Sequence, residues 1–230
     1  MSKKKNNKPQ PLFELKKIHP LTKTQEHTFR SYYSDKNLML HGYPGTGKTY
    51  VSLYLALKDV FLPTPKYDKI MVIRSIVPSR DIGFLPGSVK EKARVYEEPY
   101  KEICDSLFGR GDGYEILKMK NLVDFTTTSF LRGKTFNNTV VIVDEMQNMS
   151  GQELDTIMTR MGDNSKIIFC GDFRQSDLTD KEKAGLFEFI NITKRMNCFE
   201  YIEFHKEDIV RSALVKEYII AKTEYQDEQK

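Results

Sequence analysis

The stretch Gly42-Tyr43-Pro44-Gly45-Thr46-Gly47-Lys48-Thr49 fits the phosphate-binding pattern G-x-x-x-x-G-K-[ST] at every specified position. It follows an apolar segment, 37–41, that is typical of a strand, and the apolar spacing of 47–60 predicts a helix directly after it. Phosphates need backbone N–H groups at close range, which glycines allow. An ordinary glycine-rich turn is the alternative, but the complete motif between a strand and a helix favours a nucleotide site.

The last two residues of this stretch indicate how a nucleotide would be bound. Lys48 would contact the β- and γ-phosphates as a point charge, and the hydroxyl of Thr49 would bind Mg²⁺. The helix that begins here adds the positive end of its dipole. All eight residues, 42–49, are therefore predicted to bind a nucleoside triphosphate with Mg²⁺.

Length and composition indicate one folded domain. A chain of 230 residues can bury one α/β core, and its net charge of +4 comes from 36 basic and 32 acidic residues. Lysines crowd the start, before the first acid at Glu14, so we expect a disordered basic tail over 1–12 and the folded domain over 13–230. The three cysteines lack C-x-x-C spacing, and no apolar run approaches ~18 residues, so we expect a cytoplasmic chain without a disulfide framework, zinc site or membrane span.

Short apolar runs alternate with helical patterns along the rest of the chain. Strands are predicted at 69–74, 122–126, 139–144, 166–171 and 199–204, and helices at 22–33, 152–161, 178–189 and 209–225. This alternation predicts an α/β fold with a mostly parallel sheet flanked by helices, which binds ligands at the carboxyl edge of the sheet. Residues 78–113 interrupt the pattern as an insert rich in glycine, proline and charge.

The run Val140-Val141-Ile142-Val143-Asp144-Glu145 is an apolar strand that ends in two acids. Asp144 would belong to the Mg²⁺ shell, and Glu145 could orient and deprotonate a water that attacks the γ-phosphate. The alternative is a strand followed by an acidic helix cap. Because the sequence contains no N-K-x-D guanine motif, we expect adenine as the base and ATP hydrolysis as the reaction.

A further strand runs into Gly171-Asp172-Phe173-Arg174-Gln175. The Gln175 amide could hydrogen-bond both the terminal phosphate and the attacking water, so it is predicted to sense the γ-phosphate. A polar turn with Asp172 as a helix cap is the alternative.

The segments GYPGTGKT (42–49), DEMQN (144–148) and GDFRQ (171–175) resemble the helicase superfamily 1 core and, more closely, the PhoH-like family of phosphate-starvation ATPases. The segments GFLPG (83–87), RGKT (132–135) and DIVR (208–211) extend the resemblance over roughly 22–225. It implies a RecA-like P-loop ATPase domain, a ring-like homo-oligomer such as a hexamer, and activity on RNA or single-stranded DNA. It also implies that Gln25 binds the adenine edge, although a glutamine in a polar helix is more often a surface residue.

Arg211 resembles the family's late arginine and is predicted to open the last helix. An arginine on the γ-phosphate stabilises the charge that develops in the transition state. Because one core cannot easily supply such a residue to itself, we expect a neighbouring subunit in a ring to provide Arg211. A salt bridge on a helix surface is the alternative.

The insert mixes basic residues with the aromatic side chains of Phe84, Tyr96 and Tyr100, a combination that can bind phosphates and stack bases. Its acids weaken that interpretation, and 84–86 could equally contact another subunit. The hypothesis is Mg²⁺-dependent ATP hydrolysis coupled to binding, translocation along or unwinding of RNA or single-stranded DNA. The alternatives are an ATP-gated scaffold for partner proteins and a small-molecule kinase, against which the paired acids argue.

Overall fold

The sheet has six parallel strands in the computed structural model, which describes residues 13–75, 89–131, 133–173 and 178–228. The strands are β1 (Asn37–Gly42), β2 (Lys69–Arg74), β3 (Val123–Thr127), β4 (Thr139–Asp144), β5 (Lys166–Gly171) and β6 (Phe199–Phe204). Their order is β3-β2-β4-β5-β1-β6, so β5 separates the strand before the P-loop from the strand with the two acids. This is the arrangement of a RecA-like domain, and it confirms the predicted fold class.

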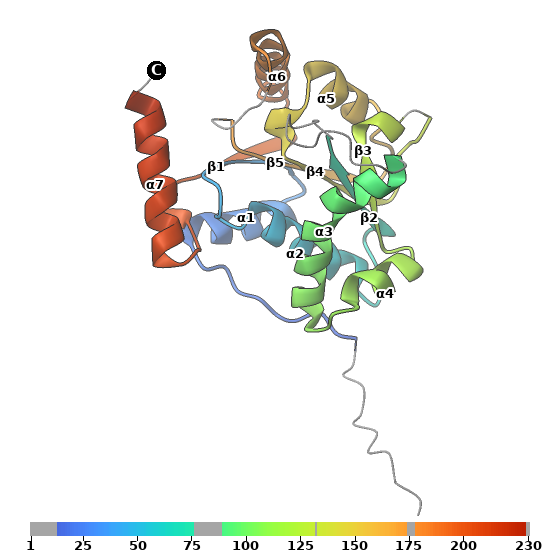
Figure 1. Cartoon of the computed structure of the whole chain (residues 1–230). Coiled ribbons are helices and arrows are strands. Elements are labelled where there is room, and N and C mark those ends of the chain that lie inside the picture. Colours follow the sequence, from blue (N-terminus) through green and yellow to red (C-terminus); the bar gives the residue numbers. More distant parts are fainter. Residues whose placement is uncertain (1–12, 76–88, 132, 174–177, 229–230) are drawn as a thin grey trace, which may run out of the picture.

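Helices cover both faces of the sheet (Figure 1). They are α1 (Lys23–Tyr33), α2 (Lys48–Val60), α3 (Val89–Phe108), α4 (Gly113–Met119), α5 (Gly151–Met158), α6 (Asp180–Thr193) and α7 (Ala213–Glu228). Side chains of α1 to α4 pack with Leu38 and Leu40 of β1, whereas α5 and α6 pack with Met39 on the opposite face. This alternation follows from the two-residue period of a strand, and it leaves the carboxyl edge of the sheet open for a site.

Local side-chain caps explain where two of the helices begin. The Thr22 side chain accepts a hydrogen bond from the backbone of Gln25 at the start of α1, and Ser150 forms a reciprocal capping box with Glu153 before α5. Each such cap stabilises a helix by about 1 kcal/mol. The helices predicted at 22–33 and 152–161 are confirmed, and none of their ends is shifted by more than three residues.

The insert contains the largest departure from the predicted elements. Most of its described part is α3, a helix of 20 residues with Pro99 inside it. Tyr100, Cys104 and Leu107 recur at helical spacing and are buried against the sheet, which stabilises the helix despite the proline. The GFLPG segment, 83–87, lies outside the described residues.

The last helix begins later than predicted. A helix was expected over 209–225, but α7 starts at Ala213. The backbone N–H of Val210 donates a hydrogen bond to the Gly45 carbonyl oxygen, 3.0 Å away, and holds this part of the chain against the P-loop. Arg211 therefore precedes α7 and does not open it.

Two further expectations concern the whole chain. Within the ranges that the structure describes, no helix has both the length and the apolar character needed to cross a membrane. The predicted basic tail, 1–12, lies outside those ranges.

Candidate nucleotide-binding site

The turn between β1 and α2 has a backbone that requires glycine. Gly42, Gly45 and Gly47 have φ angles of 117°, 72° and 84°, a region that residues with a side chain rarely adopt. A Cβ on Gly42 would lie 2.1 Å from the carbonyl oxygen of Phe204, because β6 packs directly on the turn. The P-loop is therefore fixed between its own helix and a neighbouring strand.

Lys48 folds back over this turn. Its Nζ donates hydrogen bonds to the carbonyl oxygens of Gly42 (2.9 Å) and Tyr43 (2.8 Å). Burial lowers the pKa of Lys48, whereas nearby acidic groups, including Asp172, oppose that change. The amine thus contacts carbonyl oxygens of the turn. In a P-loop, the lysine at this position binds phosphate oxygens.

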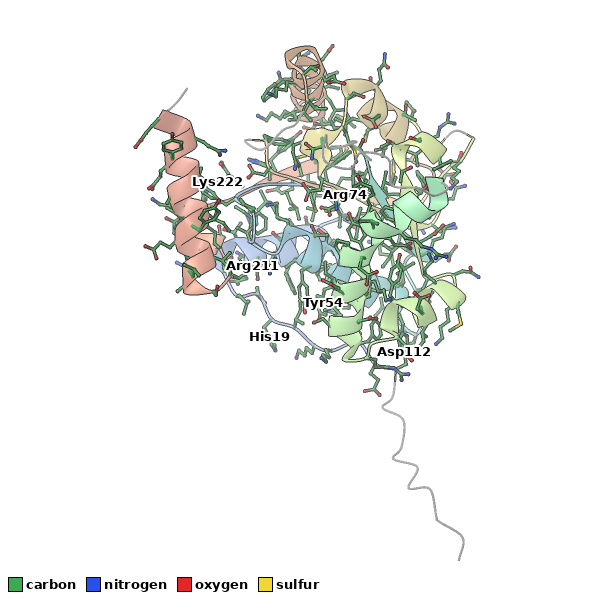
Figure 2. All side chains as sticks on the ribbon, in the orientation of Figure 1. His19, Tyr54, Arg74, Asp112, Arg211 and Lys222 are labelled. Carbon is green, nitrogen blue, oxygen red and sulfur yellow. The ribbon has the colours of Figure 1, made fainter. Side chains whose placement is uncertain are left out.

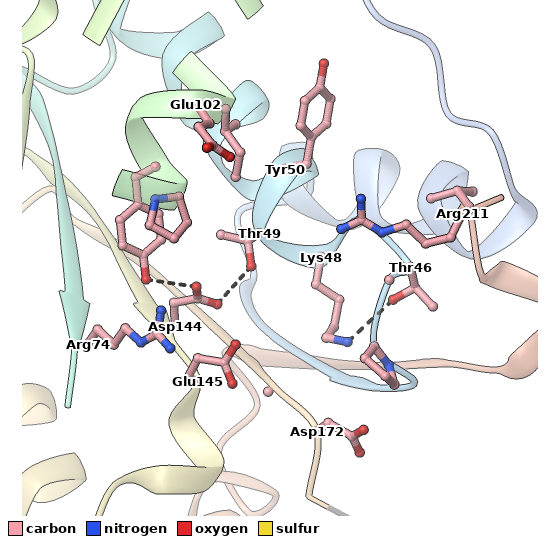
Figure 3. Close-up of a pocket in the computed structure, with 18 of the residues that line it drawn as sticks. Thr46, Lys48, Thr49, Tyr50, Arg74, Glu102, Asp144, Glu145, Asp172 and Arg211 are labelled. Atoms are coloured by element: carbon pink, nitrogen blue, oxygen red, sulfur yellow. Dashed lines mark hydrogen bonds between the residues drawn. The ribbon is translucent and has the colours of Figure 1, made fainter. Parts of the chain in front are cut away.

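Asp144 ends β4 and is joined to two helices by its two carboxylate oxygens. The Thr49 hydroxyl donates to Oδ1 (2.8 Å), a bond drawn as a dashed line in Figure 3, and the Tyr100 hydroxyl donates to Oδ2 (2.9 Å). Burial and then the charge of Glu145 raise the pKa of Asp144, and the two hydrogen bonds oppose the rise. The carboxylate is therefore held in one orientation between α2 and α3.

The pair Thr49 and Asp144 fits a magnesium site. A hydroxyl and a carboxylate are hard oxygen ligands of the kind that Mg²⁺ prefers, and here their oxygens are 2.8 Å apart. Among the described residues, no group of three or more His, Cys, Asp or Glu side chains could hold a metal by itself. Mg²⁺ usually binds through one or two protein oxygens together with substrate phosphates and water, and one hydroxyl with one carboxylate suits that mode.

Glu145 has a left-handed backbone, with φ 54° and ψ 41°, and such conformations concentrate at functional sites. Its Oε2 accepts a hydrogen bond from Gln147 Nε2 (2.5 Å), and Gln147 Oε1 accepts one from the backbone N–H of Asp172 (3.1 Å). Gln147 therefore connects the acid after β4 to the loop after β5.

Gln25 is buried, with 4% of its surface exposed, so the alternative that it is a surface residue of α1 is wrong. Its Nε2 donates to the carbonyl oxygen of Thr46 (2.9 Å), and its Oε1 accepts from the backbone N–H of Leu21 (2.8 Å). The side chain ties the segment before α1 to the P-loop. Its role at the adenine edge stays a prediction.

Lys48, Thr49 and Asp144 line a cavity with a volume of about 730 Å³. Arg211 and Arg74 line this cavity too. Arg211 lies near the base of α7 (Figure 2), and a Cβ on Gly45 would be 2.9 Å from its Cγ. Arg74 ends β2 beside Asp144 in the sheet register, with its guanidinium carbon 5.5 Å from the ring centre of Tyr96. Arg211 therefore lines the cavity of its own chain, and a neighbouring subunit is not needed to bring it there.

Tyr100 differs from its predicted role as a base-stacking residue. Its side chain is completely buried, and its hydroxyl is bonded to Asp144. A base cannot stack on a ring that has no exposed face. Helical spacing in 94–108 could have indicated the burial, but nothing in the sequence indicated the partner of the hydroxyl.

The cavity brings together most of the residues predicted from the sequence, namely Pro44, Gly45, Thr46, Gly47, Lys48, Thr49, Asp144, Glu145 and Arg211. Gly42 and Tyr43 belong to the turn and accept hydrogen bonds from Lys48, and Gln25 donates to Thr46, but these three residues do not line the cavity. Gln147 and Asp172 also line the cavity and were not predicted as site residues, although both stand inside quoted motifs. Gln175 lies outside the described residues.

Comparison with known proteins gives a consistent family match. The sequence pattern of the family described as PhoH-like protein matches residues 17–223. The chain is 33% identical over 181 residues to a PhoH-like protein of Bacillus subtilis, covering 78% of this chain and 56% of that protein. It is 31% identical over 192 residues to Protein PhoH of Escherichia coli K12, covering 83% and 54%. The chain thus spans little more than half the length of these curated relatives.

Some solved structures match most of this chain at low similarity. Bacteroides Pif1 bound to ssDNA has a TM-score of 0.40 at 16% identity, covering 82% of this chain and 42% of that one. The Sulfolobus solfataricus SWI2/SNF2 ATPase core in complex with dsDNA has a TM-score of 0.47 at 13% identity, covering 84% and 46%. At such identities the likeness concerns the fold alone.

Proposed function

We propose that this chain, which belongs to the PhoH-like protein family, binds ATP together with Mg²⁺ and hydrolyses it. The observation that carries the proposal is the 2.8 Å hydrogen bond between Thr49 and Asp144, in the cavity that Lys48 also lines. It joins the P-loop helix to the acid-bearing strand. Neither a glycine-rich turn without a ligand nor an acidic helix cap accounts for that pairing.

Each residue has a defined part in this proposal. The turn and Lys48 bind the phosphates, while Thr49 and Asp144 hold Mg²⁺, which when bound neutralises charge on the phosphate oxygens. Glu145 accepts a proton from a water molecule, and the oxygen of that water attacks the γ-phosphorus. The bond between the γ-phosphorus and the departing ADP oxygen breaks. Arg211 stabilises charge on the transferring group, and Gln175 senses whether the γ-phosphate is present.

We further propose that hydrolysis, in the cytoplasm, is coupled to binding, translocation along or unwinding of RNA or single-stranded DNA by a homo-oligomer. The support is the sequence resemblance together with the contact from Asp144 through Tyr100 to α3, the helix of the insert. The same contact would also serve an ATP-gated scaffold for partner proteins. Because Arg211 lines its own chain's cavity, the oligomer is not required for supplying that residue.

The test is phosphate release from ATP by the wild type and by Glu145→Gln, each with and without single-stranded RNA and DNA. We expect Glu145→Gln to retain ATP binding and to lose about 10²- to 10⁴-fold in turnover, the usual contribution of a positioned base. Glu115→Gln, which changes an exposed acid on α4, is the matched control.

The remaining outcomes separate the alternatives. Turnover that rises with a strand favours the nucleic-acid activity, and turnover indifferent to every strand favours the scaffold. Phosphate that appears on an acceptor instead of in water favours the kinase. Wild-type turnover in Glu145→Gln would remove Glu145 from the mechanism.

A further inference from the structure

We propose that Tyr100 is the positioning residue for the Mg²⁺-binding carboxylate of Asp144, and that it makes this site depend on the position of α3. The inference rests on the proposed function, because it concerns the same site. Its geometric basis is that Asp144 has two donors from two helices: Thr49 of α2 on Oδ1 at 2.8 Å, and Tyr100 of α3 on Oδ2 at 2.9 Å.

Burial gives this arrangement its energetic importance. Asp144 is 7% exposed, and Tyr100 has no exposed surface. Removing a carboxylate oxygen from water costs free energy, and a hydrogen-bond donor in the protein compensates for that cost. If the donor is lost, the cost is no longer compensated. The Tyr100 hydroxyl therefore satisfies one oxygen and, with Thr49, fixes the rotation of the carboxylate group. A hydrogen bond from a neighbouring side chain orients a metal ligand, and removing such a bond typically changes metal affinity 10- to 100-fold.

The ring of Tyr100 is itself fixed from several sides. Its centre is 5.6 Å from that of Phe125 on β3, and α3 also packs against the sheet through Cys104 and Leu107. Arg74, at the end of β2, acts electrostatically on both Tyr100 and Asp144. The hydroxyl can leave Asp144 only if α3 moves or the ring changes rotamer.

The hydrogen bond between Tyr100 and Asp144 connects the insert to the nucleotide site. The helix α3 occupies much of the insert, and Pro99, next to the buried Tyr100 in its middle, lines the nucleotide cavity. A displacement of α3 would withdraw the donor from Oδ2 without touching the P-loop. A ligand that contacts the insert could thereby change Mg²⁺ binding.

The chain contains a matched control in another part of the fold. The hydroxyl of Tyr32, on α1, donates to Asp59 Oδ2 at 2.9 Å, and both side chains are buried. Neither residue lines the nucleotide cavity. Tyr32→Phe therefore removes an equivalent hydrogen bond between a buried tyrosine and a buried carboxylate, without touching the proposed metal site.

The experiment measures binding of a fluorescent, non-hydrolysable ATP analogue during titration with Mg²⁺, for the wild type, Tyr100→Phe and Tyr32→Phe. For Tyr100→Phe we expect the Mg²⁺ concentration at half-maximal binding to rise about tenfold, with affinity in EDTA within about twofold of the wild type. Tyr32→Phe should keep the wild-type Mg²⁺ requirement even where both variants lose thermal stability.

A Tyr100→Phe protein with the wild-type Mg²⁺ requirement would overturn this inference alone. A wild type whose analogue binding ignores Mg²⁺ would instead overturn the proposed function. Should Tyr100→Phe fail to fold, 3-fluorotyrosine placed at position 100 keeps the hydroxyl. Its ¹⁹F resonance should shift when Mg²⁺ is added to the analogue-bound protein, and an unchanged resonance would count against the inference.

Discussion

The backbone N–H of Val210 donates a hydrogen bond to the carbonyl oxygen of Gly45, with 3.0 Å between the nitrogen and the oxygen. This bond docks the segment before α7 on the P-loop. Arg211 follows the docked residue directly and lines the cavity of its own chain, and α7 begins two residues later, at Ala213.

From this contact we predict that Arg211 acts within its own chain. Arg211→Ala should keep nucleotide binding and lose about 10³-fold in turnover, because the charge of the transition state loses its partner. Mixing Arg211→Ala with Glu145→Gln tests the source of the arginine. The first protein keeps the base and the second keeps the arginine, so activity can return only if subunits share the site. We expect none to return.

The exposed Arg195, in the turn after α6, provides the control. Arg195→Ala should leave phosphate release unchanged. Recovery of turnover in the mixture, measured at concentrations where subunits exchange, would show instead that a neighbouring chain supplies Arg211.

A second prediction concerns the support of Glu145. A Cβ on Gly171 would lie 2.7 Å from Met146 Cγ and 2.8 Å from Gln147 Oε1. Gly171→Ala should therefore displace Gln147 and loosen its hydrogen bond to Glu145. We expect turnover to fall about 10- to 100-fold, since small misplacements of catalytic groups have effects of that size. Overpacking should also lower the free energy of unfolding by about 1–3 kcal/mol.

Steady-state kinetics and urea unfolding measure these two effects. Gly111→Ala is the matched substitution, because a Cβ there would meet no atom within 4 Å. If Gly171→Ala lost stability but kept full turnover, the Gln147 contact would have no part in positioning Glu145.

These examples show which parts of the molecule the sequence could predict. The strands and the P-loop have local signals, namely apolar runs, glycines and a helix start, so their positions followed from neighbouring residues. By contrast, α3 was missed because Pro99 and the glycines and prolines of 78–87 obscured its apolar spacing. The contacts of Tyr100 and Gln147 cross between elements distant in sequence, and no local pattern encodes such a partner.

A third prediction concerns Gln25, whose burial also depends on tertiary packing. Its Nε2 donates to the Thr46 carbonyl oxygen, so Gln25→Glu would place a carboxylate against a carbonyl. We expect at least a several-fold loss of ATP affinity and a loss of about 1–3 kcal/mol in the free energy of unfolding. If Gln25 also binds the adenine edge, Gln25→Ala should reduce the preference for ATP over GTP.

Competition binding with the two nucleotides and thermal unfolding provide the measurements. Gln152→Ala, on the exposed side of α5, should change neither. If Gln25→Ala lowered the affinity for ATP and for GTP equally, Gln25 would support the P-loop without binding the adenine edge.

The fourth prediction comes from a buried amine at the other end of the sheet. Lys166, the first residue of β5, is 3% exposed, and its Nζ donates to the carbonyl oxygens of Tyr32 (3.0 Å) and Lys36 (2.5 Å). Burial, with a further contribution from Lys66, lowers the pKa of Lys166 to about 8, while Asp35 and Asp59 oppose the change.

An unfolded lysine has a pKa of about 10.4, so above pH 8 the folded protein releases a proton that the unfolded chain retains. Stability from this group therefore rises with pH, whereas below pH 8 both states are protonated and the burial penalty stays constant. Relative to Lys166→Met, the wild type should gain about 1–2 kcal/mol in unfolding free energy between about pH 7.5 and 9.5, measured with urea. Lys222→Met, at an exposed site on α7 (Figure 2), controls for lysine loss and should differ from the wild type by a constant amount. Parallel pH profiles for the wild type and Lys166→Met would mean that Lys166 keeps its ordinary pKa because water reaches the amine.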